Sequence, residues 1–551
     1  MSSERSPANS WLLIPAGVRT SVWGLLSALL LVLAAPPHDG WPLALVALVP
    51  LLVILRTASP GSAMAQGWWC GFATNLAGFW WLFPLLERFG HFSGWTRVLL
   101  LMGLCAYQGS VFALWAGASA FLAKRAHLPW LVSAPLAVAV AESLVPFLFP
   151  WNLAVTLWRA WPLIQVAELG GPPAVSALLV LFNLVVVELW VAWRQARPIP
   201  QRAWFGMGVW LGLIALGLLR AAHIATAREE APHVRVGIVQ PNSGVIDVEA
   251  RTRNGEKYLT PLRDSTRELA RRGASLVVWP ESAFPYLFDR QLDRAYAPGH
   301  PWELSPGFQG TLLFGALSHS FGGALVHNSA VLVSPSGKVA GLSDKRQLFP
   351  LGEFIPFENR FPEWAAQMRE RLPESPKIEP GTEPRLLVSG PLRIGALICY
   401  EDILPDSLRS LTRLNPNLLV TLSNHAWFGD GAVPEQALAL ATLNSVQVRR
   451  DLVRATSTGV SSLGDALGRV EARSALVAET DAPAWVIGDV ALLEVFAVGP
   501  HLATGFPYAC ALTLLLVGIC QHRSMRGSGA KGGGKKRRRA LPLREERPSD
   551  E

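Results

Sequence analysis

The 551-residue chain is half hydrophobic, carries only 16% charged residues and contains 22 tryptophans. This composition is typical of a membrane protein and excludes an ordinary soluble enzyme as a description of the whole chain. The formal net charge of +8 comes largely from Lys and Arg in short loops and in the tail, a pattern that indicates membrane orientation rather than a nucleic-acid partner.

Almost continuous apolar sequence up to about residue 225 predicts seven membrane-spanning helices, because about 20 apolar residues cross a bilayer. We expect them at 20–36, 41–55, 64–86, 98–122, 129–149, 172–193 and 203–222. An eighth is expected from Ala503 to Cys520, although its shortness and its glycine and proline leave a soluble-core helix as the alternative. The first span is followed by others, so we expect an uncleaved anchor.

Lys and Arg residues in short loops predict the orientation, because they concentrate on the cytoplasmic side. With eight spans, one side holds most of them: Arg5, Arg19, Arg56, Lys124, Arg125, Arg194, Arg197, Arg202 and the run Lys535–Arg539. The opposite loops hold only Arg88, Arg97 and Arg159. Both termini are therefore expected in the cytoplasm, with the polar domain on the other side.

The chain divides into a membrane region (1–225), an α/β domain (226–492), a last membrane helix (493–522) and a basic tail (523–551). Within the domain, strands are expected at 234–240, before Glu281, at 312–316, 330–333, 339–342, 392–398 and 418–422, and in a hairpin at about 452–473. Helices are expected at about 250–272 and 434–450. Apolar strands alternating with helices predict a sheet covered by helices.

Three chemically reactive side chains end or directly follow these strands: Glu281, Lys345 and Cys399. Cys399 is the only cysteine of this domain, which indicates a free thiol and a candidate nucleophile. A carboxylate can take the proton of a thiol, and a lysine can stabilise an oxyanion. Singly, each residue has an ordinary explanation: a packed core cysteine, a solvated strand-end acid and a surface lysine. Together they favour a catalytic site.

The surrounding motifs make a resemblance specific. Trp279-Pro280-Glu281, Lys345 with Glu353, and Cys399-Tyr400-Glu401 resemble the Glu-Lys-Cys triad of the nitrilase (carbon–nitrogen hydrolase) superfamily. The segments 350–356 (PLGEFIP) and 423–429 (SNHAWFG) resemble apolipoprotein N-acyltransferases more closely, as do the membrane segments 149–151 and 162–165.

The resemblance implies a multi-pass α-helical membrane bundle with a nitrilase-like αββα sandwich outside the cytoplasm, inserted before the last of eight helices. It implies Glu281 as general base, Lys345 as oxyanion partner and Cys399 as nucleophile, with Glu353, Tyr400 and Glu401 in support. Acyl or substrate contacts are expected from aromatic residues near these motifs: Phe284, Phe349, Trp427 and Phe428.

The implied reaction moves an acyl chain from a membrane phospholipid to Cys399, and from there to the α-amine of a diacylglyceryl-cysteine on an apolipoprotein. The implied setting is a bacterial inner membrane, with the domain in the periplasm and the protein a monomer. We expect no cofactor, because metal-ligand spacings and a phosphate-binding loop are missing from the sequence. Two alternatives stay open: a membrane-tethered amidase that uses water, and a non-catalytic scaffold.

The sequence also departs from the family pattern. His425 stands where the family usually has Asp, and Ser457 where it usually has Asn. Ala437, Asn444 and Gln447 replace the usual His, Arg and Glu of the following helix. Because the Glu-Lys-Cys residues are intact, we expect thioester formation to be normal and the choice of acceptor to be altered.

Overall fold

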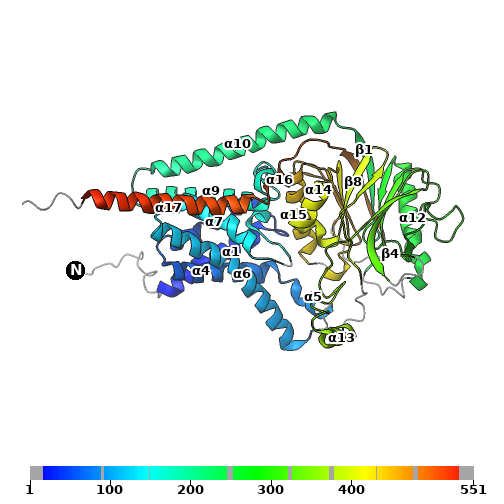
Figure 1. The fold of residues 1–551 in the computed structure, drawn as a ribbon, viewed down its shortest axis with the longest axis horizontal. Coiled ribbons are helices and arrows are strands. Elements are labelled where there is room, and N and C mark those ends of the chain that lie inside the picture. The colour runs from blue at the N-terminus through cyan, green and yellow to red at the C-terminus, as the bar shows by residue number, and fades with distance from the viewer. Residues whose placement is uncertain are drawn as a thin grey trace, which may run out of the picture.

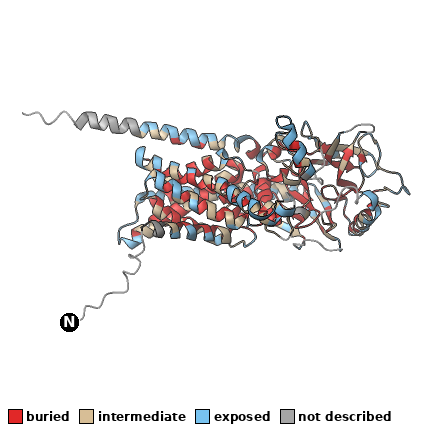
Figure 2. Ribbon diagram, turned by 90° about the horizontal axis from the view of Figure 1, so that it is seen from below, coloured by how far each residue is buried: buried red, intermediate tan, exposed pale blue. Residues whose placement is uncertain are grey.

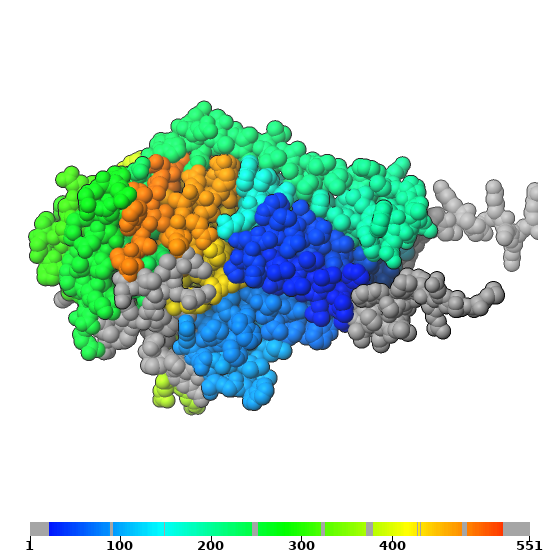
Figure 3. Space-filling view, turned by 180° about the vertical axis from the view of Figure 1, so that it is seen from behind, coloured from blue at the N-terminus to red at the C-terminus, as the bar shows by residue number. Residues whose placement is uncertain are grey.

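The computed structural model describes residues 16–532, apart from 89–91, 148, 245–251, 321–324, 372–377, 430 and 476–481. Figure 1 shows roughly parallel helices at one end of the molecule and an α/β domain at the other. In the space-filling view, the domain sits on the end of these helices, and residues 201–230 run alongside both parts (Figure 3).

The helices of the membrane part differ in length and apolar character. They are α1 (Ala16–Ala34), α2 (Ala44–Ala47), α3 (Val49–Leu55), α4 (Pro60–Gly78), α5 (Leu82–Arg88), α6 (Gly94–Arg125), α7 (Trp130–Leu144), α8 (Ala167–Gly170), α9 (Pro172–Arg194), α10 (Gln201–Glu230), α16 (Gly499–Leu502) and α17 (Phe506–Gly532). Of the described helices, α6, α9 and α10 are long and apolar enough to cross a membrane. Shorter apolar stretches lie in α1, α2–α3, α7 and α17.

Two expected spans are interrupted. The span expected at 64–86 breaks where α4 ends at Gly78 and α5 begins at Leu82. The break turns Trp81 toward the α/β domain, where its indole Nε1 donates to Gln436 Oε1 at 3.1 Å. The span expected at 41–55 is divided into a 3-10 turn and two short helices, with prolines at helix starts, where a missing N–H costs little.

The outer surface of the bundle is apolar. Large apolar side chains are exposed on α6, α10 and α17, among them Trp95, Leu99, Trp204, Phe205, Leu219, Leu512 and Leu515. Figure 2 shows α17 exposed along most of its described length. Apolar surface on this scale marks contact with lipid or protein. At about 1.5 Å per residue, α10 is about 45 Å long and extends past a hydrocarbon core of about 30 Å.

The α/β domain contains two facing sheets. The first has the order β13-β1-β2-β4-β5-β6, with β3 paired to β4, and the second has the order β12-β11-β10-β9-β8-β7. The strands of the first are β1 (His233–Gln240), β2 (Leu276–Val278), β3 (Phe288–Asp289), β4 (Thr311–His319), β5 (Val326–Val333), β6 (Val339–Asp344) and β13 (Ala484–Ala491). Those of the second are β7 (Leu386–Ser389), β8 (Leu392–Ile398), β9 (Leu418–Ser423), β10 (Leu452–Thr456), β11 (Ser462–Gly464) and β12 (Val470–Arg473).

The sheets pack through apolar side chains on their inner faces, including Ile238 and Leu332 from the first and Ile394 and Val420 from the second. Helix α12 (Gly255–Arg271) covers the outer face of the first sheet. Helices α14 (Pro405–Thr412) and α15 (Val433–Val448) cover that of the second. The expected helix–sheet–sheet–helix sandwich is therefore confirmed, and both sheets mix parallel and antiparallel pairs.

Helix α15 joins the two parts of the protein. One side packs on the second sheet, and the other packs with the membrane helices, where Leu443 and Val446 share a core with Trp158 and Ile164. Figure 1 shows α15 between the bundle and the sheets. The end of α15 is tied down by Arg449, whose Nε lies 2.8 Å from the Glu168 carboxylate of α8.

Candidate active site

Glu281, Lys345 and Cys399 meet at one edge of the sandwich. Lys345 directly follows β6, Cys399 directly follows β8, and Glu281 lies three residues beyond β2. Parallel pairing brings the C-terminal ends of β8, β9 and β10 to one edge. The sequence prediction that these residues follow strands is thus confirmed, and the structure places the side chains together.

Lys345 is the centre of the site. Its side chain is only 1% exposed, and its Nζ lies 3.2 Å from Glu281 Oε1 and 2.9 Å from Glu353 Oε2. Burial alone would lower the pKa of Lys345, but the negative charges that Cys399, as a thiolate, and the carboxylates of Glu281 and Glu353 can place beside it outweigh burial and hold that pKa well above its usual value. The lysine is therefore a fixed ammonium and not a proton donor at neutral pH.

Asn328, in the middle of β5, holds the two carboxylates at a set spacing. Its Nδ2 donates to Glu281 Oε1 at 2.8 Å and to Glu353 Oε1 at 3.1 Å. Asn328 was not among the predicted site residues, because it lies between the polar residues His327 and Ser329 and nothing in the strand sequence singles it out. Gly315 of β4 admits the turn that carries Glu281, because a methyl group there would lie 2.5 Å from Pro280 O.

Cys399 begins a short 3-10 turn in a strained conformation, with φ of 58°. Such a backbone costs a non-glycine residue about 1–3 kcal/mol and lasts only where its surroundings impose it. Glu401 contributes by accepting hydrogen bonds from the backbone N–H groups of Ile398, Arg346 and Gln347. Tyr400 contributes through its hydroxyl, which donates to Leu348 O at 2.9 Å.

The thiol is protonated at rest. Burial raises the pKa of Cys399 to about 12, and the Glu281 carboxylate, to which the thiol hydrogen-bonds, adds to the rise against the opposing effect of Lys345. A thiol, a carboxylate that hydrogen-bonds it and a neighbouring ammonium can together support attack on a carbonyl, with proton transfer accompanying the attack.

An aromatic group links the site to the membrane helices. Phe149 packs against Trp81, Phe349 and Phe428, with ring centroids 5.1, 5.8 and 6.3 Å away. Phe349 in turn contacts the ring of Tyr400, next to Cys399, with the centroids 5.5 Å apart. We call Trp81, Phe149, Phe349 and Phe428 the aromatic bridge.

The other two predicted aromatic contacts differ. Phe284 lies outside the aromatic bridge, in a buried cluster with Phe288, Tyr296 and Phe314 under α12. The chain turns at Ser282, where φ is 48°, before it reaches Phe284. The side chain of Trp427 lies outside the described part of the structure.

The positions that depart from the family pattern are mostly interior. His425, Asn444 and Gln447 are 4%, 4% and 5% exposed, and only Ala437 is partly exposed. Ser457, also buried, hydrogen-bonds Asn424. His425, Asn444 and Gln447 can therefore influence the choice of acceptor only indirectly, through the residues that they contact.

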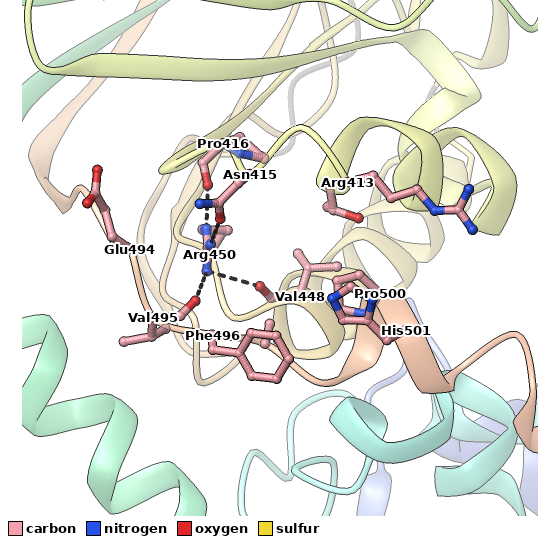
Figure 4. Close-up of a pocket in the computed structure, with 12 residues that line it drawn as sticks. Arg413, Asn415, Pro416, Val448, Arg450, Glu494, Val495, Phe496, Pro500 and His501 are labelled. Atoms are coloured by element: carbon pink, nitrogen blue, oxygen red, sulfur yellow. Dashed lines mark hydrogen bonds between the residues drawn. The ribbon is translucent and has the colours of Figure 1, made fainter.

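One cavity lies apart from this site, between α15 and the chain segment that returns to the membrane (Figure 4). Its central cation, Arg450, donates to the carbonyls of Pro416 and Val495 and to Asn415 Oδ1. Arg450 is thus occupied in closing loops. Within the described residues, no group of three or more His, Cys, Asp or Glu side chains is arranged to hold a metal ion.

Comparisons with known proteins place the chain in one family. A family model for the apolipoprotein N-acyltransferase N-terminal domain matches residues 27–185, and the carbon–nitrogen hydrolase model matches 235–491. An apolipoprotein N-acyltransferase of Geobacter metallireducens is 30% identical over 527 residues, 92% of this chain and 96% of that protein.

Two further matches cover different shares of the chain. An apolipoprotein N-acyltransferase of Azotobacter vinelandii is 30% identical and covers 84% of this chain and 88% of its own. A solved carbon–nitrogen hydrolase from Helicobacter pylori covers 47% of this chain and 90% of its own, with 16% identity and a TM-score of 0.33. From the two family models and the full-length relatives, the chain belongs to the apolipoprotein N-acyltransferase family, with membrane helices followed by a nitrilase-like domain.

Proposed function

We propose that the protein carries an acyl chain from a membrane phospholipid, through a thioester on Cys399, to the N-terminal α-amine of diacylglyceryl-cysteine on apolipoproteins. The observation that carries this proposal is the buried Lys345 ammonium, shared by Glu281 and Glu353 beside a strained cysteine. Family membership supplies the class of reaction.

In the first half-reaction, Glu281 takes the proton of Cys399 while the sulfur attacks an ester carbonyl of the phospholipid. Lys345 faces the negative charge that develops on the carbonyl oxygen, and such electrostatic stabilisation is usually the largest contribution to acyl transfer. The tetrahedral intermediate collapses with loss of the lysophospholipid alcohol, which receives the proton from Glu281.

In the second half-reaction, the neutral α-amine attacks the thioester and passes a proton to Glu281. The thiolate leaves and regains that proton, so the enzyme returns to its starting state. Glu353 takes no proton in this scheme: it fixes Lys345, and its carboxylate also accepts from the backbone N–H of Phe349 at 2.8 Å.

The aromatic bridge supports a lipid donor. It runs from Trp81 and Phe149 of the membrane part to Phe428 and to Phe349, whose ring contacts Tyr400 next to Cys399, and in this proposal it borders the path of the acyl chain. A soluble amide would gain nothing from such a path, which favours an acyl donor over the amidase alternative. The intact Glu–Lys–Cys cluster argues against a scaffold.

We further propose that the domain faces the periplasm of a bacterial inner membrane, as the Lys and Arg distribution predicts, and that the protein works as a monomer without a cofactor. Of the residues in that distribution, Arg5 and the tail lie outside the described residues.

The test uses purified protein in detergent with a labelled phospholipid and a diacylglyceryl lipopeptide. A peptide with a free α-amine should gain one acyl mass, and the same peptide with an acetylated amine should gain none. Release of free fatty acid without peptide acylation would instead support the amidase reading, and no reaction of either kind would support the scaffold.

A further inference from the structure

The strained turn at Cys399 is held by three successive side chains. Tyr400 and Glu401 are tied to the backbone of residues 346–348. Asp402 reaches in another direction and is only 2% exposed. The transfer chemistry described above assigns no task to this third tether.

Asp402 binds a buried arginine. Its Oδ2 lies 2.9 Å from Arg454 Nε, and the two side chains are 2% and 1% exposed. Arg454 Nη2 lies 3.3 Å from His425 Nε2. Asn444 of α15 fastens the same turn, since its Nδ2 donates to Asp402 O at 2.6 Å. The guanidinium of Arg454 thus contacts the side chains of both Asp402 and His425.

His425 must be neutral in this arrangement. A guanidinium only donates hydrogen bonds, so Nε2 accepts and the ring proton resides on Nδ1. Burial, reinforced by the charge of Arg454, lowers the pKa of His425 well below its usual value. Because His425 is neutral, the charge of Arg454 is balanced by a carboxylate. Among the described residues, Asp402 is the one carboxylate that pairs with Arg454.

The unit also reaches the aromatic bridge. The His425 ring meets that of Phe428 edge-on, with centroids 5.9 Å apart. One buried set of contacts therefore connects the turn that carries the nucleophile with the side chains that border the lipid path.

We propose that Asp402, Arg454 and His425 form one positioning unit that holds the strained Cys399 turn, with Asp402 supplying the carboxylate that the family usually carries at position 425. The proposal rests on the proposed role of Cys399 as nucleophile. A single carboxylate balances the buried arginine. Without a carboxylate, Arg454 is an unpaired cation. With two carboxylates, the site has an excess negative charge, which is repelled by Glu281, a residue that already acts electrostatically on Asp402. Both imbalances are costly in a buried site.

The test compares Asp402→Asn, His425→Asp and the double variant Asp402→Asn/His425→Asp. Hydrogen exchange of the peptide spanning 396–404 reports on the turn without any lipid. We expect exchange to quicken at least tenfold in each single variant and to return to within about threefold of wild type in the double variant. The rate of thioester formation should fall and recover in parallel.

Asp451→Asn is the matched control. Asp451 is a fully buried carboxylate paired with Arg228 at 3.0 Å, but it precedes β10 and so lies at the opposite end of the parallel strands from Cys399. The control should lower the melting temperature and leave exchange of the 396–404 peptide unchanged.

If the Asp402 variants do not fold, His425→Asn and His425→Leu provide a second comparison. The asparagine keeps an acceptor for Arg454 and should retain wild-type exchange, whereas the leucine should quicken it. A double variant no better than its worse parent, or a leucine variant equal to the asparagine variant, would overturn the proposal. Rescue of exchange in a protein that forms no thioester would instead overturn the proposed function alone.

Discussion

Lys345→Met is the perturbation whose effect the site geometry specifies most fully. The substitution keeps an unbranched chain of similar length and removes only the ammonium. Two carboxylates, 3.2 and 2.9 Å from Nζ, then remain together in a buried site with Asn328 as their common donor. Removing one partner of a buried ion pair costs about 3–5 kcal/mol, and protonation of one carboxylate will recover part of that cost.

The catalytic loss should be comparable in size. Removal of one donor to an oxyanion lowers kcat by about 10²–10³-fold, so thioester formation should slow by at least that factor. The assay is the rate of acyl mass gain after mixing with a phospholipid, together with the melting temperature in detergent. Lys338→Met is the control, because Lys338 lies exposed at the turn that leads into β6.

Lys338→Met should match wild type in both measurements. A Lys345→Met protein that acylates at the wild-type rate would remove the lysine from the mechanism. A variant as stable as the control would show that the two carboxylates do not depend on the ammonium.

Three further predictions follow from the same geometry. Glu281→Gln should slow thioester formation by about 10²–10⁴-fold. Iodoacetamide should nevertheless alkylate the Cys399 thiol faster at pH 8, because loss of the carboxylate lowers the thiol pKa from about 12. An alkylation profile moved to higher pH would contradict this. Phe149→Ala should slow acylation most for long acyl chains. Phe284→Ala, which alters the separate cluster under α12, should lower stability without making the acylation rate depend on acyl-chain length. Equal effects of chain length in the two variants would exclude the aromatic bridge as the lipid path. A periplasm-dependent reporter fused after residue 300 should be active and one within 194–202 silent, and the reverse pattern would place the domain in the cytoplasm.

The fold of the domain was predictable because its apolar runs end abruptly at polar residues. β8 ends at Ile398 and β6 at Asp344, and the reactive residues follow directly. β13 was not predicted, because its half-exposed burial pattern gives only a weak alternation. The hairpin expected at about 452–473 is instead a three-stranded meander, in which β11 pairs antiparallel with both β10 and β12.

The contacts that complete the site were less predictable, because they join segments far apart in the chain. Nothing local marks Trp81 as a partner of Gln436, 355 residues away. Asn328 donates to both carboxylates only because the β5–β6 pairing brings it beside Lys345. Phe284 is the opposite case, because it is near Glu281 in the sequence but its side chain packs in the cluster under α12.

Intact mass of the purified protein shows whether Cys399 carries the acyl chain. After incubation with a phospholipid of defined chain length, wild type should gain one acyl mass that neutral hydroxylamine removes, and Cys399→Ala should gain none. Cys520 is the one exposed cysteine among the described residues, and Cys520→Ala should behave as wild type. A hydroxylamine-labile acyl adduct on the Cys399→Ala protein would contradict the account.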